Sequence, residues 1–165
     1  MASKKGIIVT IIILAVITSA SFLLWAIPEN NETTFVVSDY EGYYLGVKNI
    51  QEVLQESINI EYQNLRNGDI TPQEYVAVTD VTTSQVTAQI SEFVTSKPAE
   101  KWQDSYISYM DAMKKFNSYV VETKVLANLI ENGDSETEMN ETIEKIESLK
   151  AEYLELVKNS ENLQP

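Results

Sequence analysis

The sequence predicts an all-α protein in which an N-terminal transmembrane helix precedes an extracytoplasmic antiparallel four-helix bundle. Two observations support this prediction. Residues 6–27 are mostly apolar and carry no charged side chain, and the chain beyond them shows four amphipathic segments separated by three short breaks. Apolar residues that recur every three or four positions indicate helices that bury one face.

The segment 6–27 has the length and the flanks of a membrane anchor. As a helix it spans roughly 33 Å at about 1.5 Å per residue, and a hydrocarbon core is about 30 Å thick. Lys4 and Lys5 precede it, and basic residues favour the cytoplasmic side. We therefore expect a single-pass protein of the cell membrane with residues 1–5 in the cytoplasm and the C-terminal domain outside. A secretory signal cleaved at residues 18–20 is the alternative, and it also exports the domain.

Composition excludes several kinds of chemistry. The chain has no cysteine and no histidine, which excludes disulfides, thiol nucleophiles and imidazole bases or ligands. All 25 acidic residues but only 10 of the 12 basic residues follow residue 27, so the exported part has a formal charge of −15. Such a surface repels nucleic acid. We expect a protein without enzymatic activity that binds no cofactor, catalytic metal or nucleic acid.

The bundle is predicted to occupy residues 38–158, after a polar tether over 28–37. Ser38 and Glu41 have the spacing of a capping box, which predicts the start of the first helix, and Gly68 follows its end. The apolar face of this helix should consist of Tyr43, Val47, Ile50, Leu54, Ile58, Tyr62 and Leu65.

The second helix is predicted to begin with the capping box of Thr71 and Glu74, with Pro72 at its first position, and to reach about Thr95. Its middle is rich in valine and threonine, whose branched side chains weaken helices. A strand is the alternative, but the rest of the chain offers no partner strands. The predicted apolar face consists of Tyr75, Val78, Thr82, Val86, Ile90 and Phe93.

The third helix is predicted to be the longest, since no proline or glycine interrupts the chain between Pro98 and Asn132. A break within it is the alternative. Its apolar positions alternate steps of four and three, as in coiled coils; they are Trp102, Tyr106, Tyr109, Met113, Phe116, Val120, Thr123, Ala127 and Ile130. A flanking apolar stripe implies that this helix is central or contacts another protein, and an overhanging end would suit pairing with a second copy. That stripe is Ile107, Met110, Val121, Val125 and Leu129.

Gly133 should end the third helix, and the capping box of Ser135 and Glu138 should start the fourth, which we expect to reach about Lys158. Residues 159–165 are polar and are predicted to form a flexible tail. Short connections favour antiparallel neighbours. The apolar face of the fourth helix should consist of Met139, Ile143, Ile146, Leu149, Tyr153 and Leu156.

Two groups of residues are candidates for protein contacts. Tyrosine is common both in cores and in interfaces, and Tyr40, Tyr43 and Tyr44 cluster at the membrane-proximal start of the first helix. The second group is the flanking stripe of the third helix. Two Asn-x-Thr sequons, at Asn31 and Asn140, are candidates for glycosylation because both lie on the exported side.

The acidic residues around the third break resemble the start of a calcium loop only in part. Asn132, Asp134, Glu136 and Glu138 alternate as oxygen ligands would. Thr137, however, stands where the turn glycine belongs, and Ile143 where the bidentate glutamate belongs. Helix capping therefore explains these acids better.

Three segments resemble small single-pass membrane proteins of ammonia-oxidising archaea: residues 3–6, residues 34–40, and residues 83–90 with the following Pro98. The resemblance implies an archaeal cell surface and carries no activity or site residues. The layout is also similar to anchored helical bundles of the LemA type, although the Arg-Arg and Pro-Asn-Leu-Val signatures of that family are missing.

These observations favour a module that acts through protein contacts, as an accessory or scaffold component of a membrane or cell-envelope assembly. Its expected partners are membrane lipid through residues 6–27, a membrane or envelope protein, and a second copy of the chain. The alternative function is a ligand-sensing ectodomain that works with a separate signalling partner.

Overall fold

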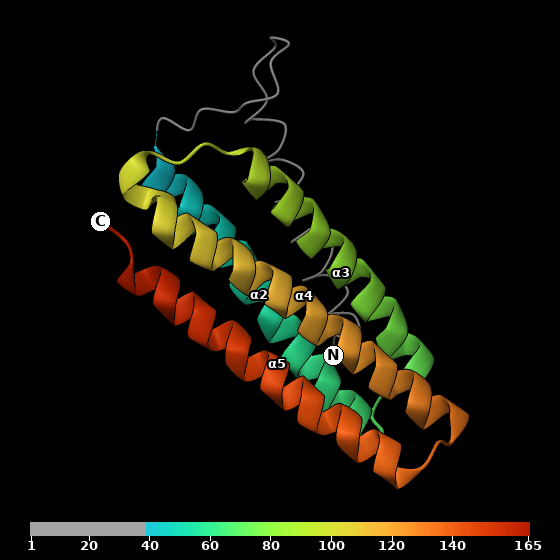
Figure 1. The fold of residues 1–165 in the computed structure, drawn as a ribbon. Coiled ribbons are helices and arrows are strands. Elements are labelled where there is room, and N and C mark those ends of the chain that lie inside the picture. The colour runs from blue at the N-terminus through green and yellow to red at the C-terminus, as the bar shows by residue number, and fades with distance from the viewer. Residues whose placement is uncertain (1–38) are drawn as a thin grey trace.

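The computed structural model describes residues 39–165, which form four α-helices and one 3-10 turn (Figure 1). The elements are α2 (Tyr40–Arg66), α3 (Pro72–Thr95), η1 (Glu100–Trp102), α4 (Gln103–Asn132) and α5 (Glu136–Asn162). The prediction of an all-helical bundle is confirmed for this part of the chain. None of these helices is long and apolar enough to cross a membrane. The predicted anchor at 6–27 lies outside the described residues.

Successive helices run in opposite directions, and α4 is the central one (Figure 1). Its backbone has the most extensive contact with that of α5 and the next most extensive with that of α3, while α2 packs against α3 and α4. The start of α2, the connection between α3 and α4, and the C-terminus lie at one end of the bundle. The other end carries the two remaining connections.

The predicted helix boundaries are largely confirmed by the capping interactions. Thr71 and Ser135 each form a complete capping box with the glutamate three residues later. Gly68 and Gly133 adopt φ values of 73° and 71° after the ends of α2 and α4, a backbone conformation that glycine tolerates best. The start of α2 was predicted one residue too early. Its N-cap is Asp39, whose carboxylate accepts from the amide of Gly42 at 3.0 Å.

The valine- and threonine-rich middle of α3 is helical, as predicted. Threonine hydroxyls there bond to carbonyls of the preceding turn: Thr79 to Val76 at 2.8 Å and Thr82 to Val78 at 2.9 Å. These bonds satisfy polar groups that face the interior. Packing of the apolar face, with Val86 and Phe93 fully buried, therefore outweighs the low helix propensity of the segment.

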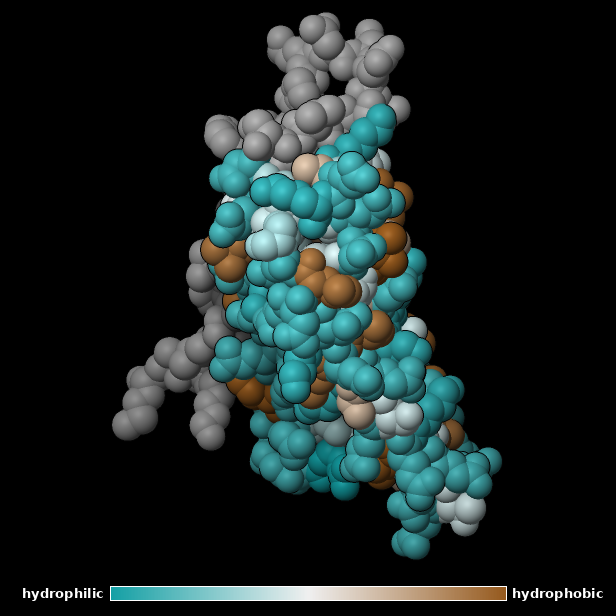
Figure 2. All heavy atoms as spheres, turned by 60° about the vertical axis from the view of Figure 1, so that its left-hand side comes forward, coloured by the Kyte–Doolittle hydropathy of each residue, from teal (hydrophilic) through white to brown (hydrophobic). Residues whose placement is uncertain are grey.

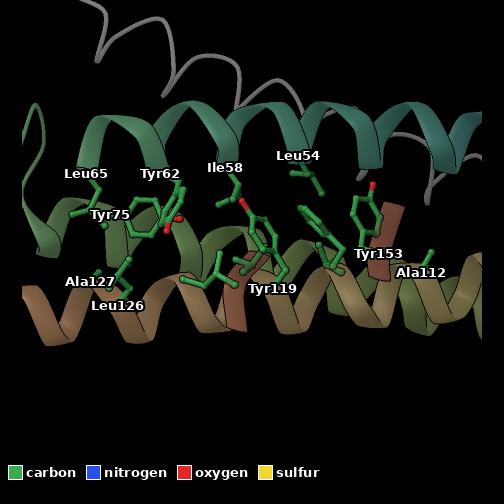
Figure 3. Close-up of a cluster of buried hydrophobic side chains, with 14 residues drawn as sticks. Leu54, Ile58, Tyr62, Leu65, Tyr75, Ala112, Tyr119, Leu126, Ala127 and Tyr153 are labelled. Carbon is green, nitrogen blue, oxygen red and sulfur yellow. The ribbon is translucent and has the colours of Figure 1, made fainter. Parts of the chain in front are cut away.

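The core divides into two clusters along the bundle. One contains mainly aliphatic side chains together with Tyr62, Tyr75, Phe116, Tyr119 and Tyr153, and Figure 3 shows them between α2 and the facing helices. The other is mainly aromatic and lies where α2 begins; its members are Tyr40, Tyr43, Tyr44, Val47, Phe93, Trp102, Tyr109 and Met113. The predicted apolar faces thus supply most of the interior, and the buried hydrophobic residues outside those faces are Tyr40, Tyr44, Ala112, Tyr119 and Leu126.

The third predicted helix is continuous as α4 and is the longest of the described helices, as predicted, but the expected long overhang is absent. It has 30 residues, against 27 in both α2 and α5. The chain between Pro98 and α4 instead forms an extended residue and the turn η1. No long overhang is therefore available in the described bundle for pairing with a second copy.

Polar side chains at seven-residue intervals fix the register of α4 against both neighbours. Toward α3, Lys124 pairs with Asp80 and Gln73 donates to Glu131. Toward α5, the ion pairs are Lys115 with Glu152 at 2.7 Å and Lys145 with Glu122 at 2.8 Å. A one-turn slip of either neighbour along α4 would break each such pair. Comparable flanking charges set helix alignment in coiled coils.

The prediction of a flexible tail from residue 159 is wrong for its first residues, because α5 continues to Asn162. Ser160 is fully buried. Its hydroxyl donates to the carbonyl of Ser105 at 2.7 Å and lies 2.8 Å from the Tyr44 hydroxyl, and the Ser105 hydroxyl donates to the Ser160 carbonyl at 2.9 Å. The last turn of α5 therefore joins α2 and α4. The sequence did not predict this contact, because small hydroxyl side chains form it and the apolar pattern does not include them.

Candidate functional site

The tyrosines predicted as a contact surface lie in the interior. Tyr40, Tyr43 and Tyr44 are only 5%, 5% and 3% exposed. The ring of Tyr43 stacks on Phe93 with centroids 6.0 Å apart, and that of Tyr44 meets Trp102 at the same distance. These residues hold α2 against α3 and α4. They are part of the core, which corrects the expectation that they form a surface.

The second predicted group contains three of the four exposed large apolar residues of α4; the fourth is Ile130, which was expected on the buried face and is 37% exposed at the end of the helix. Ile107, Val121 and Val125 are 43%, 44% and 39% exposed, whereas Met110 and Leu129 are half-buried. Because ion pairs connect the flanks of α4 to α3 and α5, the three exposed residues lie on the strip between those neighbours. We call Ile107, Val121 and Val125 the outer face of α4.

The outer face of α4 is interrupted by charge. Asp111 and Lys114 form an ion pair at 3.0 Å between Ile107 and Val121. The apolar part is therefore two short areas separated by a polar turn, which suits a contact with both apolar and charged groups. Figure 2 shows a mainly hydrophilic face of the molecule with scattered hydrophobic residues, and single exposed hydrophobic residues are normal on folded proteins.

The described residues offer little that could support catalysis. Residues 39–165 contain no group of three or more acidic side chains placed to hold a metal ion. A hollow of about 600 Å³ lies along α2, and its described lining comes from that helix alone: Glu52, Gln55, Glu56, Asn59, Ile60, Gln63 and Asn64. A small-molecule site is usually enclosed by several elements, and this hollow has only one described wall.

Burial raises the pKa of most tyrosine side chains further above physiological pH. The pKa of Tyr153 rises to about 12. The other tyrosines with a raised pKa are Tyr40, Tyr43, Tyr62, Tyr75, Tyr106, Tyr109 and Tyr119. Desolvation is the main cause in each case, because burial disfavours the charged phenolate.

A polar junction that the sequence did not reveal joins three helices. The Asn59 side-chain oxygen on α2 accepts from the Tyr119 hydroxyl of α4 at 3.1 Å and from the Lys150 amine of α5 at 2.9 Å. The Lys150 amine also lies 6.0 Å from the centre of the Tyr119 ring. Only the register between helices brings these residues together, and no spacing within one helix signals it.

The structure describes one of the two predicted glycosylation sequons. Asn31 lies outside the described residues. Asn140 is exposed near the start of α5. The Thr142 of its sequon is buried, and its hydroxyl donates to the Glu138 carbonyl at 2.9 Å. The asparagine is therefore accessible, whereas the threonine that completes the sequon is held inside the folded helix.

Comparisons of the chain with protein-family models, with curated proteins and with solved structures find no match.

Proposed function

We propose that the protein is a membrane-anchored helical module outside the cytoplasm that acts through protein contacts, as an accessory or scaffold component of a membrane or cell-envelope assembly. The observation that carries this proposal is the outer face of α4, where Ile107, Val121 and Val125 are exposed on the central helix of the bundle. The apolar segment 6–27 after Lys4 and Lys5 supports the anchor.

The charge of the chain supports a protein partner. With a formal net charge of −13, the protein repels nucleic acid and anionic lipid surfaces and attracts basic patches. The partner should therefore present apolar side chains together with basic groups to the outer face of α4. Contacts of this mixed kind are typical of non-obligate assemblies.

The first test is affinity purification of a C-terminally tagged chain from its native membranes in mild detergent, followed by native sizing and mass spectrometry. A stoichiometric membrane or envelope protein should co-elute. Val121→Glu combined with Val125→Glu should abolish this co-elution, whereas Leu154→Glu, the same kind of change at an exposed position of α5, should leave it intact. A monomer without companion would refute the scaffold function and favour ligand sensing.

The proposed topology has its own test. Because the chain has no cysteine, a single Ser3→Cys or Gln164→Cys substitution gives one labelling site. In intact cells a membrane-impermeant maleimide should label the cysteine at position 164 and not that at position 3. Labelling of both or of neither position in intact cells would contradict the single-pass topology, and permeabilised cells provide the control for reactivity.

A further inference from the structure

We propose that α2 separates from α3, α4 and α5 as a unit before the bundle as a whole unfolds. Among the described helices, α2 is joined to the others by one connection only, residues 67–71. It can therefore leave without breaking the antiparallel order of the other three. Local opening of this kind occurs where the contacts of one element are weaker than those of the rest.

The extent of backbone contact between the helices is the first observation behind this proposal. The most extensive backbone contact is that of α4 and α5, where the residues Ser105, Ser108 and Ala112 are small and buried. The Ser108 hydroxyl donates directly to the Leu156 carbonyl at 3.0 Å. The backbone of α2 has less extensive contact with its neighbours.

Most of the bridges between α2 and α5 are made by the ends of long polar side chains, whereas the buried 2.8 Å contact between the Tyr44 and Ser160 hydroxyls opposes the separation. The Tyr153 hydroxyl donates to the Gln55 side chain at 2.8 Å, and the Lys150 amine donates to the Asn59 side chain at 2.9 Å. Lys48 pairs with Glu161 where both groups are partly exposed. Water can replace each of these partners when α2 leaves, so their net contribution to holding it is small.

The second observation is an uneven distribution of unpaired polar groups. Gln51 of α2 is 1% exposed, and its side-chain amide lies beside the Tyr153 hydroxyl without forming a hydrogen bond of normal geometry through either its nitrogen or its oxygen. Gln89 is 7% exposed, and neither of its side-chain amide atoms has a hydrogen-bond partner. Gln89 lies one turn before Phe93, whose ring stacks on Tyr43 of α2, so it shares the side of α3 that faces α2.

The contact between α4 and α5 is different in this respect. The buried hydroxyls of Ser105, Ser108 and Ser160 all have hydrogen-bond partners. An unpaired buried polar group loses its hydration without compensation, and separation of α2 would return water to Gln51 and Gln89. Separation of α2 therefore removes the desolvation cost of Gln51 and Gln89. Separation of α4 from α5 would give no such gain, because the buried hydroxyls there are hydrogen-bonded.

Apolar packing opposes the separation and keeps the open form a minor state. Leu54 and Ile58 are buried against the facing helices (Figure 3), and the aromatic cluster holds the first turns. In the open form, these side chains and the groove that receives them become accessible.

Hydrogen exchange measured by mass spectrometry on the full-length chain in mild detergent tests this proposal. Amides of α2 should exchange through an opening that leaves α4 and α5 protected. Gln51→Leu removes both amide atoms and should slow exchange in α2 about tenfold with little change in α4, because a buried polar group without a normal hydrogen bond destabilises the closed form. Gln63→Leu makes the same change at an exposed position of α2 and should not slow it.

A covalent link gives a second test that does not depend on a core substitution. Lys48→Cys with Glu161→Cys, joined by a short bismaleimide, connects α2 to α5 and should bring exchange in α2 down to the rate of α5. The matched pair Lys115→Cys with Glu152→Cys connects α4 to α5 and should leave α2 exchange unchanged. Equal opening of α2, α4 and α5 in the unmodified chain, or equal effects of the two links on α2, would overturn the proposal.

Discussion

The buried hydroxyl of Ser160 provides the sharpest test of the structure, because the sequence places it in a flexible tail. In the structure this hydroxyl donates to the Ser105 carbonyl at 2.7 Å and lies 2.8 Å from the Tyr44 hydroxyl. Ser160→Ala removes both interactions and leaves the buried Tyr44 hydroxyl without that partner. The substitution keeps the helix intact, since alanine is the best helix former.

The magnitude follows from these contacts. Each lost hydrogen bond costs about 0.5–1.5 kcal/mol net, and a buried group left unpaired costs about 1–3 kcal/mol. The gain in helix propensity from serine to alanine returns about 0.5 kcal/mol. We expect Ser160→Ala to lower the free energy of unfolding by about 2–3 kcal/mol. Urea denaturation of the full-length chain in mild detergent, followed by circular dichroism, measures this change.

Ser148→Ala is the matched control, because Ser148 is an exposed serine on the same helix that bonds only to the neighbouring Glu152 at 3.2 Å. It should change the free energy of unfolding by less than about 0.5 kcal/mol. If Ser160→Ala and Ser148→Ala have the same small effect, the last turn of α5 is frayed in solution, and the reasoning from the serine network is refuted.

Three further predictions concern the core, the register and pH. Phe116→Ala, at a fully buried site, should lower the free energy of unfolding by about 3–5 kcal/mol in urea, against less than about 0.5 kcal/mol for Leu154→Ala at an exposed site; equal losses would contradict the assigned core. Lys124→Asp should lower the free energy of unfolding by about 0.5–1 kcal/mol, and adding Asp80→Lys should restore most of this loss. The coupling between the two substitutions should weaken at high salt, and absence of coupling would argue against the α3–α4 register. In the folded chain the pKa of Tyr153 is about 12, whereas in the unfolded chain it is about 10. The unfolded chain therefore loses this proton first, and the free energy of unfolding should fall as the pH rises from about 10 to 12. Tyrosinate absorbance that appears well before the helical signal is lost would contradict the burial of this side chain.

The helices and their buried faces could be predicted from the sequence because both are local properties. Apolar positions such as Ile58 and Phe116 recur at helical spacing, and Thr71 and Ser135 have the spacing to the following glutamate that a capping box requires. Periodicity shows which side of a helix is apolar. It does not show whether a neighbouring helix covers that side. The tyrosines at the start of α2 were therefore predicted to form a contact surface, although they lie in the core.

Contacts between helices could not be predicted, since they depend on register. Ser105 and Ser160 are distant in sequence, and neither is apolar, yet they meet in the interior. The three-helix junction at Asn59 has the same origin. Polar residues at such positions look like solvent-exposed ones until the neighbouring helix is placed. The exposed residues of α4 were predictable as a stripe, but their separation by the Asp111–Lys114 pair was visible only with the spatial arrangement.

Both ends of the described bundle, which are the first turn of α2 and the C-terminus, lie at one pole (Figure 1). The connections at 67–71 and 133–135 lie at the other. A reporter fused to the C-terminus would therefore sit beside the point where the N-terminal segment enters. An epitope inserted next to Gly68 or Gly133 would instead project from the far pole, about 40 Å away at roughly 1.5 Å per helical residue. For an anchored chain, insertion at these two glycine turns is the way to display a probe away from the lipid.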